Sequence, residues 1–299
     1  MASTLLAVIM LLSASVAMAK NLSGQSPAIA VSTQEVKNGS SLLVEIDTRH
    51  LNPPITDMRL IFGERFQPVF QHPTKSDRFY FGLLGIPYRS TPGPASLKLE
   101  WSNASGNHSQ SIPFEIVSGK YRTDTLKVDP KRVNPSKEDA ARAKREQQEV
   151  MRIYATGSMS RLWEGPFRLP IESDITSPFG NRRVFNDQLK SYHNGIDFRA
   201  QNGTPAFAAN SGTVRLAKNL FYSGNVVLID HGTGIFTIYA HLNKINVVAD
   251  RQIEKGQLVG FTGASGRVSG PHLHWGVKVN GVAVNPLQFV EVIASLLKK

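Results

Sequence analysis

Two short stretches of this 299-residue chain carry residue types that bind divalent metal ions. Residues 193–197 contain His193 and Asp197, and residues 272–274 contain His272 and His274. If both stretches are extended, strand alternation places the first pair on one face and the second pair on one face, with the intervening apolar residues directed away. Three imidazoles and a carboxylate on a shared polar face suit a first-row divalent ion, above all zinc.

This set has one more candidate than a catalytic zinc ion requires. Such an ion takes three protein ligands and keeps one position for water, so one imidazole is left for proton transfer. Alone, a His-x-His or a His-x-x-x-Asp sequence is more often a surface feature than a ligand pair. The metal interpretation is favoured because both occur in one Gly-rich chain, where five of the eight histidines fall between His193 and His274.

Composition describes a globular protein of about two domains. Hydrophobic residues make up 41% and charged residues 19% of the chain, which argues against a disordered or fibrous protein. The net charge of +11 favours anionic partners. The absence of cysteine excludes disulfides, a cysteine nucleophile and a thiolate metal site.

The N-terminus has the pattern of a secretory signal peptide over residues 1–19. An apolar run from Leu5 to Leu12 precedes Ala17-Met18-Ala19, which predicts cleavage before Lys20. The alternative, an uncleaved anchor, requires about 20 apolar residues. We therefore expect a protein exported to the periplasm or the extracellular space, without stable membrane insertion after cleavage. Export makes nucleic acid an unexpected partner and favours the acidic cell wall.

The rest of the chain predicts a mostly β protein. Short alternating strands with turn residues between them predict an immunoglobulin-like antiparallel sandwich over residues 20–118. Residues 119–165 are expected to be a linker with a solvated helix at about 136–156, opened by a capping box at Ser136. Residues 166–299 are expected to form an antiparallel β domain, with a hairpin turn at Asn280-Gly281.

Three motifs, in this order, resemble the M23 peptidases, the lysostaphin-like or LytM-type zinc endopeptidases that cut peptide bridges in bacterial peptidoglycan. They are His193-x-x-x-Asp197, Tyr239-Ala240-His241-Leu242 and Gly270-Pro271-His272-Leu273-His274-Trp275. The resemblance covers roughly residues 166–286. The segment before it is similar to the N-terminal domain of some exported members.

The resemblance implies one zinc ion per chain, held by His193, Asp197 and His274, with His241 and His272 as the catalytic histidines. We expect His241 to share a strand face with Tyr239. Further expectations are substrate contacts at Asn194 and Tyr239. Three arginines are expected to be solvated surface cations, with contact to the carboxylates of a stem peptide as the alternative: Arg182, Arg183 and Arg267.

These observations predict an exported zinc endopeptidase that hydrolyses cross-links or stem peptides of peptidoglycan. The alternative is a non-enzymatic LytM-type activator of other wall hydrolases, which is expected to have lost metal ligands. A cupin-like metal module is disfavoured because the glutamate expected after His274 is missing. The His231 side chain, next to a predicted turn, is expected to be structural or exposed.

Overall fold

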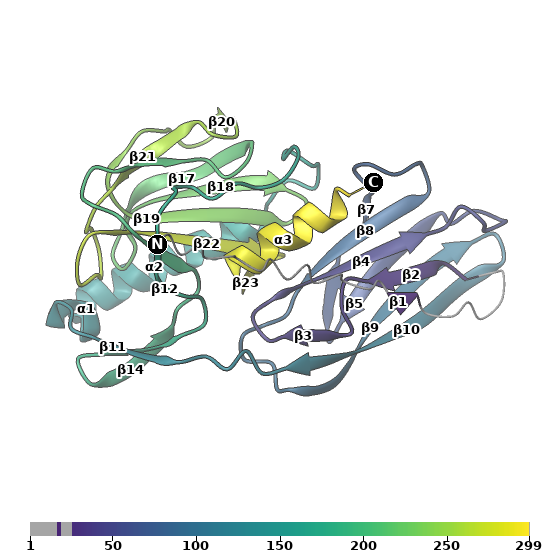
Figure 1. Cartoon of the computed structure of the whole chain (residues 1–299), viewed down its shortest axis with the longest axis horizontal. Helices are drawn as coiled ribbons and strands as arrows, with labels where there is room; N and C mark the ends of the chain where they lie inside the picture. Colours follow the sequence, from purple (N-terminus) through teal and green to yellow (C-terminus); the bar gives the residue numbers. More distant parts are fainter. Residues whose placement is uncertain (1–16, 19–25, 299) are drawn as a thin grey trace, which may run out of the picture.

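The computed structural model describes residues 17–18 and 26–298, which form two β-rich domains side by side (Figure 1). Most strand pairs are antiparallel, as the alternation predicted. The predicted signal peptide lies outside the described residues except for the short strand β1 (Ala17–Met18). Within the described part of the chain, no helix is both long and apolar enough to cross a membrane.

The N-terminal domain is a sandwich of two five-stranded sheets. The first sheet has the order β1, β2 (Ala28–Val31), β4 (Ser41–Asp47), β8 (Phe79–Gly85), β7 (Phe70–Gln71). The second has the order β3 (Glu35–Lys37), β10 (Gly106–Val117), β9 (Gly93–Asn103), β5 (Asp57–Phe62), β6 (Arg65–Gln67). Their apolar faces share one core, which contains Val44 of the first sheet and Leu99 of the second. The prediction that this sandwich is immunoglobulin-like stays a prediction.

The C-terminal domain is built on a ten-stranded sheet. Its main path runs β12 (Ile175–Ser177), β15 (Ile196–Arg199), β22 (His272–Val279), β19 (Ile235–Ile245), β18 (Gly224–Gly232), β17 (Gly212–Leu220), β20 (Gln252–Ile253). Off this path lie β16 (Pro205–Phe207), β21 (Leu258–Thr262) and β23 (Val282–Val284). The predicted hairpin between β22 and β23 is confirmed, with Asn280 and Gly281 both at positive φ.

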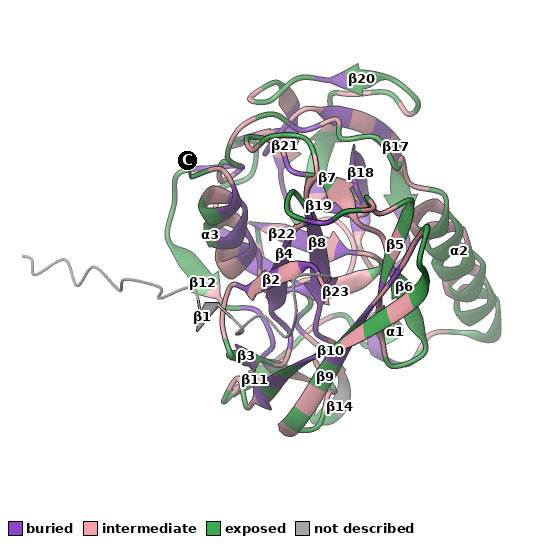
Figure 2. Cartoon of the chain, turned by 90° about the vertical axis from the view of Figure 1, so that its right-hand side faces the viewer, coloured by how far each residue is buried: buried purple, intermediate pink, exposed green. Residues whose placement is uncertain are grey.

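Helix α3 (Pro286–Leu296) joins the two domains. The Asn285 side chain caps its first turn by accepting from the Leu287 N–H, and the Asn285 N–H donates to the Gly39 carbonyl over 2.7 Å. The Gln288 amide exchanges two 2.8 Å hydrogen bonds with the backbone of Ser41. The buried side of α3 faces the sheets (Figure 2). The two domains therefore pack against each other as a continuous body.

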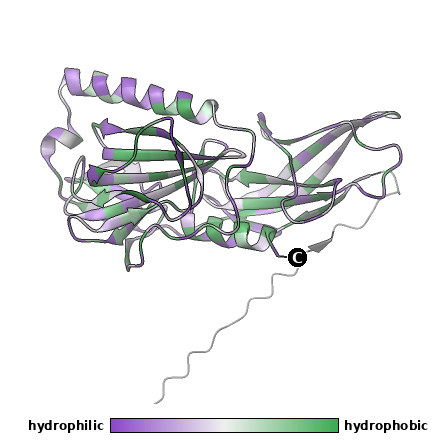
Figure 3. Ribbon diagram, turned by 90° about the horizontal axis from the view of Figure 1, so that it is seen from above, coloured by the Kyte–Doolittle hydropathy of each residue, from purple (hydrophilic) through white to green (hydrophobic). Residues whose placement is uncertain are grey.

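Helix α2 (Lys137–Ala155) confirms the predicted helix. The Ser136 side chain accepts from the Asp139 N–H at 3.1 Å, which satisfies one of the free donors of the first turn. The helix is mostly polar along its length (Figure 3). Val150 and Tyr154 nevertheless pack on the apolar side chains of β17, β18 and β19. It is therefore a cover for one face of the sheet.

The start of the linker is a strand, which the sequence did not predict. β11 (Thr123–Leu126) pairs in parallel with β13 (Arg182–Phe185), and β14 (Gln188–Tyr192) completes this three-stranded sheet. The short helix α1 (Pro130–Val133) follows. Residues 123–126 alternate only weakly between apolar and polar side chains, so they give no local strand signal. Their pairing depends on a segment more than fifty residues away.

Candidate metal centre and active-site cleft

Strands β15 and β22 and the connection before β15 bring the predicted metal ligands together. β15 runs antiparallel to β22, and the register places Asp197 directly opposite His274. β22 also pairs with β19, where Ala240 lies opposite His274. His193 precedes β15 in an extended connection, and its backbone exchanges hydrogen bonds of 2.8 Å with Gly180 and Asn181. Residues far apart in sequence thus meet because the strand pairing fixes their positions.

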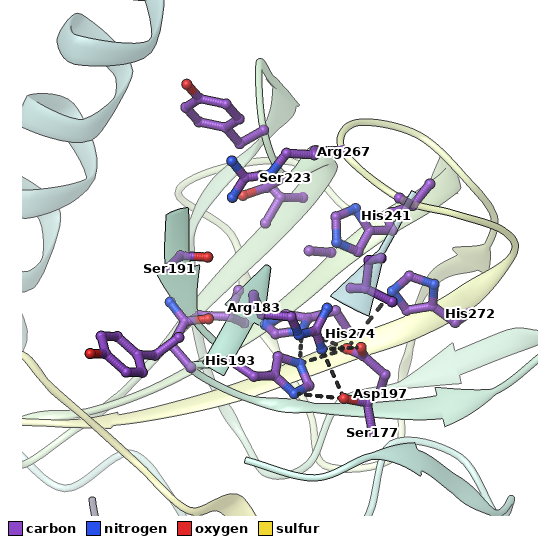
Figure 4. A pocket seen from close by; sticks show the side chains of 18 of the residues that line it. Ser177, Arg183, Ser191, His193, Asp197, Ser223, His241, Arg267, His272 and His274 are labelled. Atoms are coloured by element: carbon purple, nitrogen blue, oxygen red, sulfur yellow. Dashed lines mark hydrogen bonds and ion pairs between the residues drawn. The ribbon is translucent and has the colours of Figure 1, made fainter. Parts of the chain in front are cut away.

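The candidate ligand atoms converge on one point (Figure 4). His193 Nε2 and His274 Nδ1 each lie 2.8 Å from Asp197 Oδ1, and the two nitrogens are 3.0 Å apart. The exposed fraction of these side chains is 3% for His193, 12% for His274 and 8% for Asp197. Two imidazoles and one carboxylate form a donor set that suits zinc.

The tautomer of His193 supports a cation at this point. His193 Nδ1 lies 2.7 Å from the Pro178 carbonyl oxygen, which can only accept, so Nδ1 carries the proton. In neutral His193 the Nε2 lone pair then faces the Asp197 carboxylate oxygen. Two lone pairs at 2.8 Å repel each other unless a positive charge lies between them. The residues therefore fit a divalent metal ion.

Asp197 is held as an anion by its surroundings. Burial alone would raise the pKa of its carboxyl group, but contacts with His193 and His274 outweigh burial and hold that pKa well below its ordinary value. Its second oxygen, Oδ2, accepts a hydrogen bond from Arg183 Nη2 at 2.7 Å. The carboxylate therefore has one oxygen for a metal ion and one for Arg183.

His241 reaches the cleft through a β-bulge. β19 advances from Tyr239 to Leu242 while β18 advances from Val227 to Asn225, so β19 contains one extra residue. His241 has a φ of 62°, and its N–H donates to the Ser223 carbonyl at 3.0 Å. The expectation that His241 shares a strand face with Tyr239 is wrong, because the bulge reverses the alternation at this position.

His241 and His272 are arranged alike. His241 Nδ1 lies 2.8 Å from the Ser265 carbonyl, and His272 Nδ1 lies 2.9 Å from the Gly270 carbonyl. Each Nδ1 is therefore the protonated nitrogen, and each Nε2 keeps a lone pair. The centroids of the two imidazole rings are 4.9 Å apart. Burial lowers the pKa of both side chains, that of His241 strongly, so both are neutral proton acceptors near pH 7.

These histidines line a cleft of about 960 Å³ between the β13–β14 hairpin and the main sheet. The linker strand β11 and helix α2 also contribute to its walls. Residues 191–286 match peptidase family M23.

The M23 region has relatives whose names state an activity. The peptidoglycan DD-endopeptidase ShyA of Vibrio cholerae is 38% identical over 135 residues, which are 44% of this chain and 31% of that protein. The DD-carboxypeptidase/endopeptidase Mpg of Neisseria meningitidis is 39% identical over 113 residues, which are 38% of this chain and 26% of that protein. The chain therefore spans less than a third of the length of either relative.

A solved structure extends the similarity beyond the M23 region. A crystal structure from Pseudomonas aeruginosa, assigned to peptidase M23, superposes with a TM-score of 0.64 and 28% identity. The superposition covers 85% of this chain and 94% of that chain. The structural similarity therefore extends over most of both domains.

One expected side-chain role changes with the structure, and two others stand. Tyr239 is fully buried, and its hydroxyl accepts from the Ala209 N–H at 2.8 Å, so the predicted contact between Tyr239 and substrate is wrong. His231 is buried as well and lies outside the candidate metal site, which agrees with a structural role. Asn194 is exposed at the cleft edge and stays a candidate for substrate contact.

Sequence reasoning missed two features that hold the M23 region's site. A Cβ on Gly195 would lie 2.7 Å from His274 Nε2, so only glycine leaves room for the ligand ring. Asp124, from β11, accepts from the Asn181 side chain at 2.9 Å and from the Ser177 hydroxyl at 3.0 Å. It thereby fixes the loop that carries Pro178, the acceptor for His193. The short spacing between His193 and Asp197 could have indicated the need for glycine at position 195, whereas no sequence pattern indicated the role of Asp124.

Proposed function

We propose that this protein is an exported zinc-dependent endopeptidase that hydrolyses peptide cross-links or stem peptides of bacterial peptidoglycan. The observation that carries the proposal is the convergence of His193, Asp197 and His274 beside two further histidines, His241 and His272, whose Nδ1 atoms are held by backbone carbonyls. The activities named for ShyA and Mpg support peptidoglycan as the substrate. Export rests on the predicted signal peptide over residues 1–19, and the zinc domain is proposed to span residues 166–299.

In this proposal His193 Nε2, His274 Nδ1 and Asp197 Oδ1 would hold the zinc ion. When bound, zinc lowers the pKa of a coordinated water and polarises the scissile carbonyl. With zinc bound, one carboxylate and two neutral imidazoles would leave the site with a net positive charge, which would favour a developing oxyanion. Arg183 orients Asp197 by holding its other oxygen at 2.7 Å.

His241 and His272 handle protons in this proposal. Their Nδ1–H groups are engaged with backbone carbonyls, so each ring is fixed and presents Nε2 for accepting a proton from the attacking water. Once protonated, an Nε2–H can hydrogen-bond the oxyanion or return the proton to the leaving amine. His272 Nε2 lies 3.8 Å from Asp197 Oδ1, so this ring is close to the candidate metal point without being part of the three-ligand set.

Purified protein lacking residues 1–19 tests the proposal. It should release soluble fragments from peptidoglycan, lose this activity in a chelator and regain it with zinc. Activity that resists complete zinc removal would refute the metal mechanism. A protein that binds zinc, cleaves nothing and stimulates a separate wall hydrolase would instead be the non-enzymatic activator.

Two variants test the division of roles. His193→Ala should lose the zinc ion and activity together, because it removes a ligand. His272→Ala should keep stoichiometric zinc, measured by metal analysis, and lose turnover by about 100-fold or more. Equal loss of zinc in the two variants would contradict the separation of ligands from proton carriers.

A further inference from the structure

Arg267 is a cleft cation whose guanidinium has no polar partner in the described part of the chain. The cations that line the cleft there are Arg183, Arg267 and Lys278. Arg183 is paired with Asp197 at 2.7 Å, and Lys278 Nζ donates to the Gly281 carbonyl at 3.2 Å. No described residue accepts a hydrogen bond from the Arg267 side chain or forms an ion pair with it. Its donors are therefore available to a ligand.

Aromatic rings hold the Arg267 guanidinium in place. Its central carbon lies 4.3 Å from the ring centroid of Phe185 and 4.4 Å from that of Tyr222. Phe185 belongs to β13 on one wall of the cleft, and Tyr222 belongs to the turn between β17 and β18. Cation–π attraction restrains the group but does not satisfy its N–H donors. The Arg267 guanidinium is therefore a pre-oriented, half-buried set of N–H donors, called the Arg267 fork below.

The Arg267 fork lies beside the proposed catalytic histidines. Ser265, two residues before Arg267, accepts from His241 Nδ1, and the Arg267 N–H donates to the Tyr222 carbonyl at 2.8 Å. Figure 4 draws Arg267 and His241 in the same pocket, with Ser223 next to Arg267. Burial lowers the pKa of the guanidinium, and the positive charge of Arg183 acts in the same direction. A bound anion would therefore stabilise the charged form of the Arg267 guanidinium.

We propose that Arg267 binds a carboxylate of the peptide substrate, close to the scissile bond, and so makes the site selective for peptides that carry a free carboxylate there. This inference rests on the proposed peptidase function. The planar guanidinium matches a carboxylate with two parallel N–H···O bonds, which a neutral carboxamide cannot replace. The carboxylate belongs either to a peptide C-terminus or to an acidic side chain.

The test uses matched synthetic stem peptides and the zinc-loaded protein. One peptide has free carboxylates, one is amidated at its C-terminus, and one is amidated at its acidic side chain. The wild-type protein should prefer the free peptide over one of the amidated forms by about 10- to 100-fold in kcat/KM. The amidated form that loses activity identifies the carboxylate.

Variants separate recognition from packing. Arg267→Met, which keeps much of the apolar contact with the rings, should cleave all three peptides at similar rates, and Arg267→Lys should keep part of the preference. The matched control is Arg161→Met, because Arg161 also lies over an aromatic ring, that of Trp163 at 5.1 Å, but does not line the cleft. It should keep the full preference.

The outcomes distinguish this inference from the proposed activity. Cleavage without any carboxylate preference, or a preference that persists in Arg267→Met, overturns the role of Arg267 and leaves the peptidase intact. If no peptide is cleaved, calorimetric binding of the same peptides decides. A preference for the free peptide that disappears in Arg267→Met then supports carboxylate binding although the activity has failed, and equal or absent binding overturns it.

Discussion

Acidification should destabilise this protein through His231, and replacing that residue should remove the effect. The ring is fully buried, with Nδ1 2.7 Å from the Ser211 carbonyl and Nε2 2.7 Å from the Thr237 hydroxyl. Phe167 covers the ring at 5.0 Å. No carboxylate contacts this imidazole among the described residues, so nothing there compensates a proton on it.

The size of the effect follows from the two pKa values of His231. Burial lowers the pKa in the folded protein to about 4, from 6.5 in an exposed histidine. Between these values the unfolded chain binds a proton that the folded protein does not. The contribution of neutral His231 to the unfolding free energy is therefore fully present above pH 6.5 and is lost as the pH drops towards 4. Proton linkage gives a loss of about 2 kcal/mol on going from pH 8 to pH 5.

Urea unfolding at pH 8 and pH 5, with chelator present throughout, measures this loss. In His231→Asn the fall in unfolding free energy between the two pH values should be smaller than in the wild type by about 2 kcal/mol. The difference between the proteins cancels the contribution of the other histidines. His50→Gln, at an exposed position, should behave like the wild type. The same pH dependence in His231→Asn and in the wild type would refute the reasoning.

Two further predictions concern the support of the site and the fold. Asp124→Ala removes the acceptor that Asn181 and the loop before it use, so zinc affinity in a chelator competition should fall by about tenfold; unchanged affinity would mean that β11 does not orient the ligands. Gly232→Ala places a Cβ 1.8 Å from the Ser160 carbonyl oxygen at a φ of 77°, and should lower the unfolding free energy by about 3 kcal/mol. Gly281→Ala, at a φ of 78° with nothing within 4 Å, should cost about 1 kcal/mol, and equal losses would exclude the steric explanation.

Local features of the sequence predicted the elements that depend on local chemistry. The Ser136 cap and the Asn280-Gly281 turn each act through hydrogen bonds or dihedral angles within a few residues, so their sequence signals are reliable. Alternation in β22 likewise put His272 and His274 on one face, and both line the cleft. The mostly β, antiparallel architecture followed from the same alternation.

Non-local pairing decided what alternation could not. The extra residue that turns His241 into the cleft exists only relative to its partner strand β18, and the same register buries Tyr239. The strand β11 is formed only because β13 offers a free edge.

The same division applies to the charged residues of the cleft. The sequence determined that Arg183 and Arg267 are cations near the motif histidines, because residue type fixes charge. The tertiary structure alone decided that Arg183 is paired with Asp197 and that Arg267 is held between two aromatic rings, with no carboxylate partner among the described residues. An ion pair requires a partner within a few ångströms, and the packing of distant segments sets that distance.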